Sequence, residues 1–185
     1  LITVETIDEV AKEVGLKDEI SLITEEAMQG HLDFTESFKK RLSILKGINN
    51  SICESVYSRK VELSPGAEEL INYFKSNQIK MAVVSGGLKF FAEKLTSQLG
   101  IENCRANNVE IINQSITGNI IGNVIDAKEK AKYIGELCNQ YKLKETQVIA
   151  IGDGANDIEM MKIAGLSVAY HAKPILKQYC NIHIN

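Results

Sequence analysis

The sequence lacks the patterns that mark several classes of protein. Its four cysteines show neither CxxC pairing nor the density of a disulfide-stabilised scaffold, and its three histidines are too few for a zinc cluster. No run approaches the ~18 apolar residues that span a bilayer, and no basic-then-apolar signal segment opens the chain. We therefore expect a cytoplasmic protein with no membrane partner.

The sequence also has no extended cluster of positive charge, because the lysines and arginines are dispersed and the formal net charge is only −3. A protein that binds a nucleic-acid backbone needs an extended basic surface, so nucleic acid is not an expected partner. Hydrophobic residues make up 44% of the 185 residues, enough for one packed core with a modest insertion. The pattern leaves open whether the protein is a monomer or a homodimer.

Two kinds of pattern divide the chain near Ser64. From Val4 to about Arg59, apolar residues recur at helical spacing, which predicts four short helices. Later segments alternate between helix and strand patterns, which predicts an α/β fold with a parallel sheet covered on both faces. The expected later elements are helices over 67–76, 88–99, 127–141 and 157–164, buried strands over 80–84 and 147–151, a strand over 166–170, and a hairpin over 107–120.

The first of two polar strand ends suits a phosphate. In open parallel sheets, ligands bind beyond the carboxyl ends of the strands. Ser85, Gly86 and Gly87 follow the strand over 80–84 and offer a hydroxyl and backbone N–H groups, as a phosphate site requires. An ordinary strand-to-helix turn is the alternative.

The second polar strand end suits a metal ion. The strand over 147–151 is followed by Gly-Asp-Gly-Ala-Asn-Asp, which sets the carboxylates of Asp153 and Asp157 close to the carboxamide of Asn156. Oxygen ligands of this kind suit Mg²⁺, and a nearby cation relieves the repulsion between two adjacent carboxylates. The alternative is a turn in which Asn156 caps the next helix.

Two basic residues lie on helix faces that should be buried. Lys130 shares a face with the apolar residues of its helix, and a buried ammonium needs an anionic partner. Either a bound anion or a structural ion pair with Asp153 would supply one. Arg41 lies on the apolar side of its own helix, where its guanidinium suits a carboxylate. A surface arginine that extends into water is the alternative.

Together these segments resemble a known family. Three segments are similar, in order and separation, to motifs II, III and IV of the haloacid dehalogenase-like phosphatases. They are VVSGG, the lysine of DAKEK and IGDGANDIEM. Four further segments resemble the phosphoserine phosphatase branch, so the resemblance covers essentially the whole chain. These segments are TVETIDEVAKEVG, EEAMQGHLDFTESFKKRLSILKG, LSPGAEELI and HAKPILK. It implies a Rossmann-like core over 1–3 and 62–185 and a small inserted four-helix cap over 4–61.

The resemblance also implies an activity, namely Mg²⁺-dependent hydrolysis of O-phospho-L-serine to L-serine and phosphate, the last step of serine biosynthesis, through an aspartyl phosphate. Ser85 and Gly86 are implied to hold the phosphoryl oxygens, Lys130 to neutralise their charge, and Asp153 to ligate Mg²⁺. Asn156 and Asp157 are implied to complete or orient the site. The implied catalytic residues are Lys130 and Asp157, and the implied substrate-binding residues are Glu5, Met28, Phe34, Arg41, Ser85, Gly86, Lys130 and Asn156.

The departure from the family is large. Its nucleophile and its acid/base are the two aspartates of a DxDxT motif on the first strand, immediately before the segment that begins here as Leu1-Ile2. Residues 1–185 contain no such motif, so we expect turnover near background from this chain alone. Because Leu1 is not an initiator methionine, and because the family has a terminal helix beyond Asn185, we expect a longer natural protein.

Two other functions stay open at this point. The same fold could pass the phosphoryl group from phosphoserine to another hydroxyl, such as that of homoserine, because the sequence does not distinguish water from an alcohol as acceptor. A degenerate relative could instead bind phosphoserine for a regulatory purpose without any catalysis.

Overall fold

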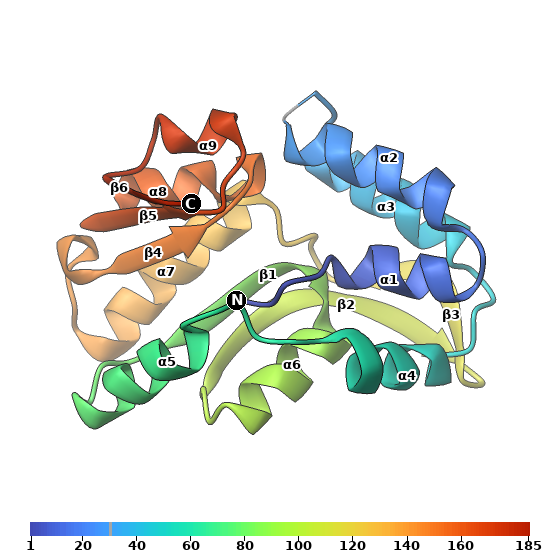
Figure 1. Cartoon of the computed structure of the whole chain (residues 1–185), viewed down its shortest axis with the longest axis horizontal. Coiled ribbons are helices and arrows are strands. Elements are labelled where there is room, and N and C mark those ends of the chain that lie inside the picture. Colours follow the sequence, from blue (N-terminus) through green and yellow to red (C-terminus); the bar gives the residue numbers. More distant parts are fainter. Residues whose placement is uncertain (30) are drawn as a thin grey trace. The chain divides into compact units, whose positions relative to one another are not determined.

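The chain divides into two compact units (Figure 1). The computed structural model describes residues 1–29 and 31–185, with the side chain of Met28 outside the described part. The first unit holds Leu1–Ser21 and Lys39–Asn123, and the second holds Leu22–Phe38 and Val124–Asn185. This division differs from the expected cap over 4–61 and core over 1–3 and 62–185. That domain organisation therefore stays a prediction.

Within the described residues, helices and strands follow the predicted α/β order, with four helices before residue 62. The helices are α1 (Thr6–Glu13), α2 (Lys17–Met28), α3 (Phe34–Ile44), α4 (Ser51–Lys60), α5 (Ala67–Ser76), α6 (Lys89–Gln98), α7 (Ala127–Tyr141), α8 (Ile158–Ile163) and α9 (Pro174–Lys177), with 3₁₀ turns η1 (Glu145–Gln147) and η2 (Ala155–Asp157). The strands are β1 (Ala82–Leu88), β2 (Asn103–Ile112), β3 (Ser115–Ile121), β4 (Ile149–Gly152), β5 (Leu166–Tyr170) and β6 (Ile182–Ile184). Sequence patterns did not indicate α9 and β6.

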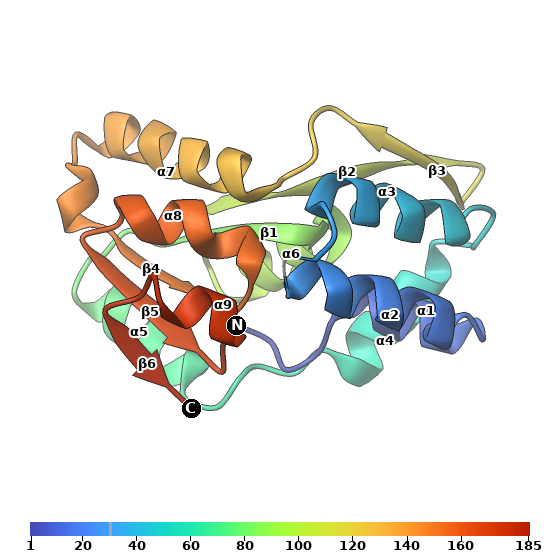
Figure 2. The ribbon, with the colours of Figure 1, turned by 90° about the horizontal axis from the view of Figure 1, so that it is seen from above.

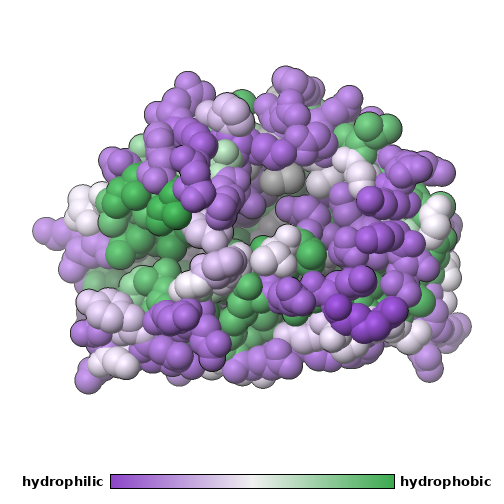
Figure 3. Space-filling model, viewed as in Figure 1, coloured by the Kyte–Doolittle hydropathy of each residue, from purple (hydrophilic) through white to green (hydrophobic). Residues whose placement is uncertain are grey.

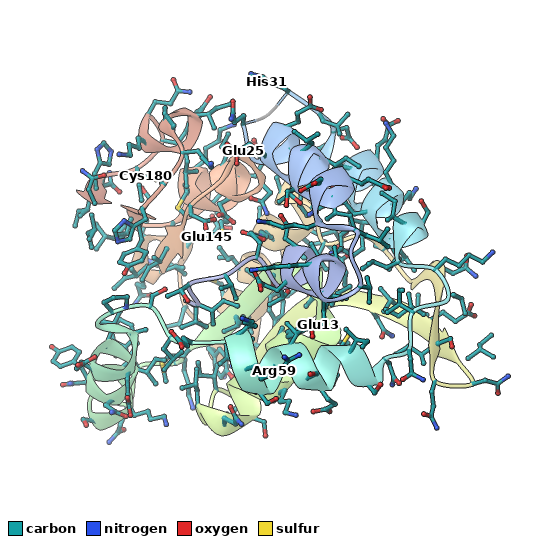
Figure 4. The ribbon with its side chains drawn as sticks, turned by 45° about the vertical axis from the view of Figure 1, so that its right-hand side comes forward. Glu13, Glu25, His31, Arg59, Glu145 and Cys180 are labelled. Atoms are coloured by element: carbon teal, nitrogen blue, oxygen red, sulfur yellow. The ribbon has the colours of Figure 1, made fainter. Side chains whose placement is uncertain are left out.

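The first unit is built on a three-stranded sheet. Strand β1 runs parallel to β2, and β2 pairs antiparallel with β3. The predicted hairpin is confirmed, because Asn113 and Gln114 form its turn with φ angles of 50° and 63°, a conformation that asparagine adopts more easily than most residues. Helix α6 packs on β1 and β2, and α1 packs on α4. A 2.5 Å ion pair between Glu13 and Arg59 joins these last two helices (Figure 4).

The second unit contains a wholly parallel sheet in the order β4-β5-β6. Helix α8 packs on β4 and β5, and α7 lies beside α8 (Figure 2). Helix α7 begins after Asp126, whose carboxylate accepts the N–H of Glu129 at 2.9 Å, and it ends before Lys142, whose φ is 55°. These caps satisfy backbone groups that a helix end leaves without partners.

One face of this parallel sheet is only partly covered. Ile149 and Ile151 on β4 and Ile182 and Ile184 on β6 keep between 43% and 47% of their surface exposed, and Figure 3 shows hydrophobic surface over this sheet. The prediction of a buried strand over 147–151 is therefore wrong for these two residues of β4. The reason is that strand side chains alternate between faces, so Ala150 is buried while its neighbours point to the opposite face.

Two simpler expectations can be compared with the structure. All four cysteines are free, as their spacing predicted. Among the described residues, no helix has both the length and the apolar character that crossing a bilayer requires.

Candidate active site

The Ser85-Gly86-Gly87 segment, called the Ser85 turn below, lies within β1 at the place where its register with β2 shifts. The prediction that the strand ends at Val84 before these residues is therefore wrong, because β1 continues to Leu88. The N–H of Gly87 donates to Oγ of Ser85 at 3.0 Å. A Cβ atom at position 87 would lie 3.3 Å from that oxygen, which is closer than most Cβ contacts, so glycine leaves room for the turn. Because the Ser85 oxygen accepts from Gly87, its hydroxyl proton can be donated to a bound anion.

Asn107 holds this turn from the neighbouring strand. It has no exposed surface, and its Nδ2 donates to the carbonyl oxygen of Gly86 at 2.7 Å. The register between β1 and β2 shifts at this place, between Ser85 and Leu88. Sequence analysis missed Asn107, and the only signal was a polar residue within a strand pattern.

We expect Asn107→Leu to destabilise the protein by about 1–3 kcal/mol, because the partly buried carbonyl of Gly86 loses its donor. It should also speed amide exchange in residues 85–87. Asn103→Leu is the matched control, since Asn103 on the same strand donates to the carbonyl of Met81 at 3.0 Å, away from the turn. Urea unfolding and hydrogen exchange measure both effects. Equal exchange at 85–87 in the two variants would contradict this role for Asn107.

A buried ion pair joins α7 to the end of η2 in the second unit. Nζ of Lys130 on α7 lies 2.6 Å from Oδ1 of Asp157, and their side chains are only 6% and 4% exposed. The buried position of Lys130 that helical spacing predicted is confirmed. Its direct partner is Asp157, so the alternative of an ion pair with Asp153 is wrong in this detail. A charge pair so well enclosed interacts more strongly than one in water.

The second carboxylate oxygen of Asp157 orders the loop after β4. Oδ2 accepts the backbone N–H groups of Asp153 at 3.0 Å and of Gly154 at 3.3 Å. A Cβ atom on Gly152 would lie 2.5 Å from this oxygen, so only glycine allows the approach. The helix α8 has Asp157 and not Asn156 as its N-terminal flanking residue, so the alternative of a capping Asn156 is wrong.

Asp153 presents its carboxyl group at the surface of the same loop. The residue is exposed, yet many protein atoms surround it, and this partial loss of water raises the pKa of the Asp153 carboxyl. The charge of Asp157 raises that pKa further, while Lys130 opposes both effects. A divalent cation would relieve this repulsion.

The donor set fits a magnesium ion that keeps most of its own water. Among residues 1–29 and 31–185, no three acidic, histidine or cysteine side chains are grouped as a metal site. Magnesium commonly uses one or two carboxylates, with water and substrate phosphate as its other ligands. Asp157 is occupied by Lys130 and two amides, which leaves Asp153 as the carboxylate of this loop that suits the ion.

Arg41 forms a separate charged group in the first unit. It is 4% exposed, so the alternative of a surface arginine is wrong. Burial lowers the pKa of the Arg41 guanidinium, and the charges of Asp8 and then Glu5 oppose this shift. Sequence analysis named Glu5 but missed Asp8, although Glu5 immediately precedes α1 and Asp8 lies three residues later, in its first turn.

The remaining predicted residues lie on or near the second unit's loops. Phe34 begins α3 and stacks on Phe38 with ring centroids 6.3 Å apart. Asn156 lies within η2 and is partly buried. The contacts that were predicted for the Met28 side chain lie outside the described residues.

The structure thus brings the predicted residues together in three groups. The first unit contains the Ser85 turn and the Arg41 group, and the second contains Lys130, Asp153 and Asp157. The expected meeting of Ser85 with Lys130 and Asp153 at a single phosphoryl group stays a prediction, as do the individual roles.

Known proteins are similar to this chain in sequence and in fold. The family described as haloacid dehalogenase-like hydrolase matches residues 4–162. A phosphoserine phosphatase of Archaeoglobus fulgidus is 43% identical over 96% of this chain, which spans 51% of that protein. One of a Polaromonas species is 40% identical over the whole chain, which spans 80% of that protein.

Solved structures agree with the sequence comparison. A phospho-aspartyl intermediate analogue of phosphoserine phosphatase has a TM-score of 0.95 and 38% identity over the whole of this chain and 88% of its own. A substrate-bound phosphoserine phosphatase complex has the same TM-score and identity, with 87% of its chain covered. The α/β fold with parallel sheets is therefore confirmed. The chain belongs to the haloacid dehalogenase-like hydrolase family, within which these similar proteins are phosphoserine phosphatases.

Proposed function

We propose that the protein to which this chain belongs hydrolyses O-phospho-L-serine to L-serine and phosphate, as the last step of serine biosynthesis. The observation that carries the proposal is the buried Lys130–Asp157 ion pair beside the surface carboxylate of Asp153. An ammonium held in this way can neutralise a phosphoryl group without reorganisation, and such prearranged charge is the main source of catalysis in phosphoryl transfer.

The chain's own residues would divide the work of binding. The hydroxyl of Ser85 and the N–H of Gly86 would donate to phosphoryl oxygens, with Asn107 holding the turn in place. The guanidinium of Arg41 would bind the carboxylate of the substrate, because a planar fork of donors fits that group. Glu5 would accept hydrogen bonds from the amino group of the substrate.

A magnesium ion would be held by Asp153, with Asn156 contributing to the arrangement of the loop. When bound, Mg²⁺ would stabilise negative charge that develops on the phosphoryl oxygens. The position of the Asp153 backbone depends on Asp157, since Oδ2 of Asp157 accepts its N–H. Asp157 would therefore orient both the ammonium of Lys130 and the metal-binding loop.

The test of this function is phosphate release from phosphoserine with and without Mg²⁺. Family members use an aspartate of DxDxT as nucleophile and a second one as acid/base, and residues 1–185 contain no such motif. We expect this chain alone to release phosphate at the background rate, and a chain with an upstream DxDxT segment to release it only with Mg²⁺. Robust Mg²⁺-dependent release by residues 1–185 would show that the nucleophile lies elsewhere.

Two controls separate this function from its alternatives. Adding homoserine to the active form should leave the yield of inorganic phosphate unchanged. Phosphorylated homoserine as a product would indicate a phosphotransferase. Tight phosphoserine binding without any release from the extended chain would indicate a regulatory binding protein.

A further inference from the structure

An ion pair joins helix α2 to the loop before α9. Nζ of Lys173 lies 2.7 and 2.8 Å from the two carboxylate oxygens of Glu25, which is labelled on α2 in Figure 4. The side-chain amide of Gln29 donates to the same carboxylate at 2.6 Å. The carboxylate therefore accepts from two side chains, and these contacts define its orientation.

The backbone of Lys173 is hydrogen-bonded to the backbone of Asp153, the residue that we propose as the metal ligand. Its N–H donates to the carbonyl oxygen of Asp153 at 2.8 Å, and its own carbonyl accepts from Leu176 at 3.0 Å. The following Pro174 restricts Lys173 to extended backbone, and its φ and ψ are −60° and 147°. The ammonium of Lys173 therefore extends from a fixed base beside Asp153.

Glu25, the other residue of the ion pair, lies near the C-terminal end of α2. This end of the helix belongs to the same unit as the Asp153 loop. Residues 22–38 form part of the second unit, whereas the first residues of α2 and the last residues of α3 belong to the first. Glu25 lies within the last turn of α2, which ends at Met28. The family resemblance implies that Met28 and Phe34, on either side of the α2–α3 connection, line the substrate site.

The strength of the contact suits a reversible role. The side chains of Glu25 and Lys173 are 48% and 32% exposed, and ion pairs at such positions are screened by salt and add little to folding stability. The hydrogen bond from Lys173, and then that from Gln29, lower the pKa of the Glu25 carboxyl, so the Glu25 carboxylate stays charged at neutral pH. A contact of this strength shifts an equilibrium between two positions of a helix without locking it.

We propose that Glu25 and Lys173 form a latch that docks the end of α2 on the Asp153 loop and thereby positions α2 for substrate binding. The docking of α2 does not depend on what the protein binds. The effect of this docking on phosphoserine binding rests on the proposed function. Glu25 and Lys173 are positioning residues, because they act through α2 and the loop and not on the phosphoryl group.

Hydrogen exchange on the 185-residue chain tests the docking. We expect Glu25→Gln and Lys173→Met to speed amide exchange in residues 22–28 by about two- to fivefold, the range in which exposed ion pairs shift an equilibrium. Lys173→Arg should keep the slow exchange, and the charge-exchanged Glu25→Lys/Lys173→Glu should restore it. Adding 0.5 M NaCl should speed the wild-type chain and leave the two single variants unchanged.

A matched control removes a similar ion pair that lies within one helix. Lys162→Met breaks the 2.7 Å pair with Glu159 on α8 and should not change exchange in α2. The latch is wrong if both single variants exchange like the wild type, or if the charge-exchanged variant exchanges as fast as they do.

Kinetics on a chain with an upstream DxDxT segment tests the effect on substrate. Glu25→Gln and Lys173→Met should raise KM for phosphoserine about two- to fivefold without lowering kcat, and Lys173→Arg should restore the wild-type KM. An unchanged KM beside faster exchange would overturn the positioning role. If that chain does not hydrolyse phosphoserine at all, the proposed function fails, while the exchange experiment still decides the latch.

Discussion

Replacing Asp157 with asparagine should lower the free energy of unfolding by about 3–5 kcal/mol, because it leaves the ammonium of Lys130 buried without a counter-charge. The two side chains are 6% and 4% exposed and lie 2.6 Å apart, so water cannot replace the lost partner. Asparagine has only one acceptor oxygen, so its NH2 group must face either Lys130 or the N–H groups of Asp153 and Gly154, and this lost hydrogen bonding adds to the loss of charge. Urea unfolding followed by circular dichroism, with the m-value checked for constancy, measures the loss.

The double variant Asp157→Asn/Lys130→Met separates a lost ion pair from general damage. With both charges removed, no unpaired ion is buried, so the double variant should be more stable than Asp157→Asn alone. Glu159→Gln is the control, because its pair with Lys162 is 43% and 46% exposed and should contribute less than about 1 kcal/mol. Additive losses in the double variant would mean that the two charges do not depend on each other.

The burial of this pair's lysine could be predicted from the sequence because it depends on one helix alone. The period of 3.6 residues places Lys130 on the same side of α7 as Ile134 and Cys138, and all three are buried. The same local argument found the buried Arg41 on α3. It also gave α5, α7 and β5 their exact bounds, since each is delimited by its own turn or capping residues.

The partners of these residues could not be predicted in the same way. That Lys130 pairs with Asp157 and not with Asp153 depends on how η2 folds the loop, and the two acids differ by only four positions in the sequence. The contact between Asn107 and Gly86 depends on the β1–β2 register and on its shift after Ser85, which joins residues 21 positions apart. The exposed face of β4 depends on which helices cover the sheet. The residues of β4 do not indicate this, because Ile149 and Ile151 are apolar although they are exposed.

Gly165 allows two backbone segments to approach each other at the start of β5. A Cβ atom at this position would lie 2.0 Å from the carbonyl oxygen of Thr146 and 2.5 Å from its carbonyl carbon. Both belong to the backbone of η1, so no side-chain rotation can relieve the clash. The N–H of Gly165 also donates to the carbonyl of Glu145 at 3.0 Å, and the N–H of Leu166 donates to that of Val148 at 3.1 Å. These bonds hold the start of β5 against the approach to β4.

We therefore expect Gly165→Ala to cost about 3 kcal/mol, at the upper end of what an added methyl group costs in a packed site. It should also speed amide exchange in β4 and β5, because η1 must move away from the strand that follows. Gly135→Ala is the matched control. It lies within α7, and a Cβ atom there has no atom within 4 Å, so alanine should stabilise the protein by up to about 1 kcal/mol through helix propensity. Equal unfolding midpoints for the two variants would mean that the chain does not approach itself at Gly165 as closely as described.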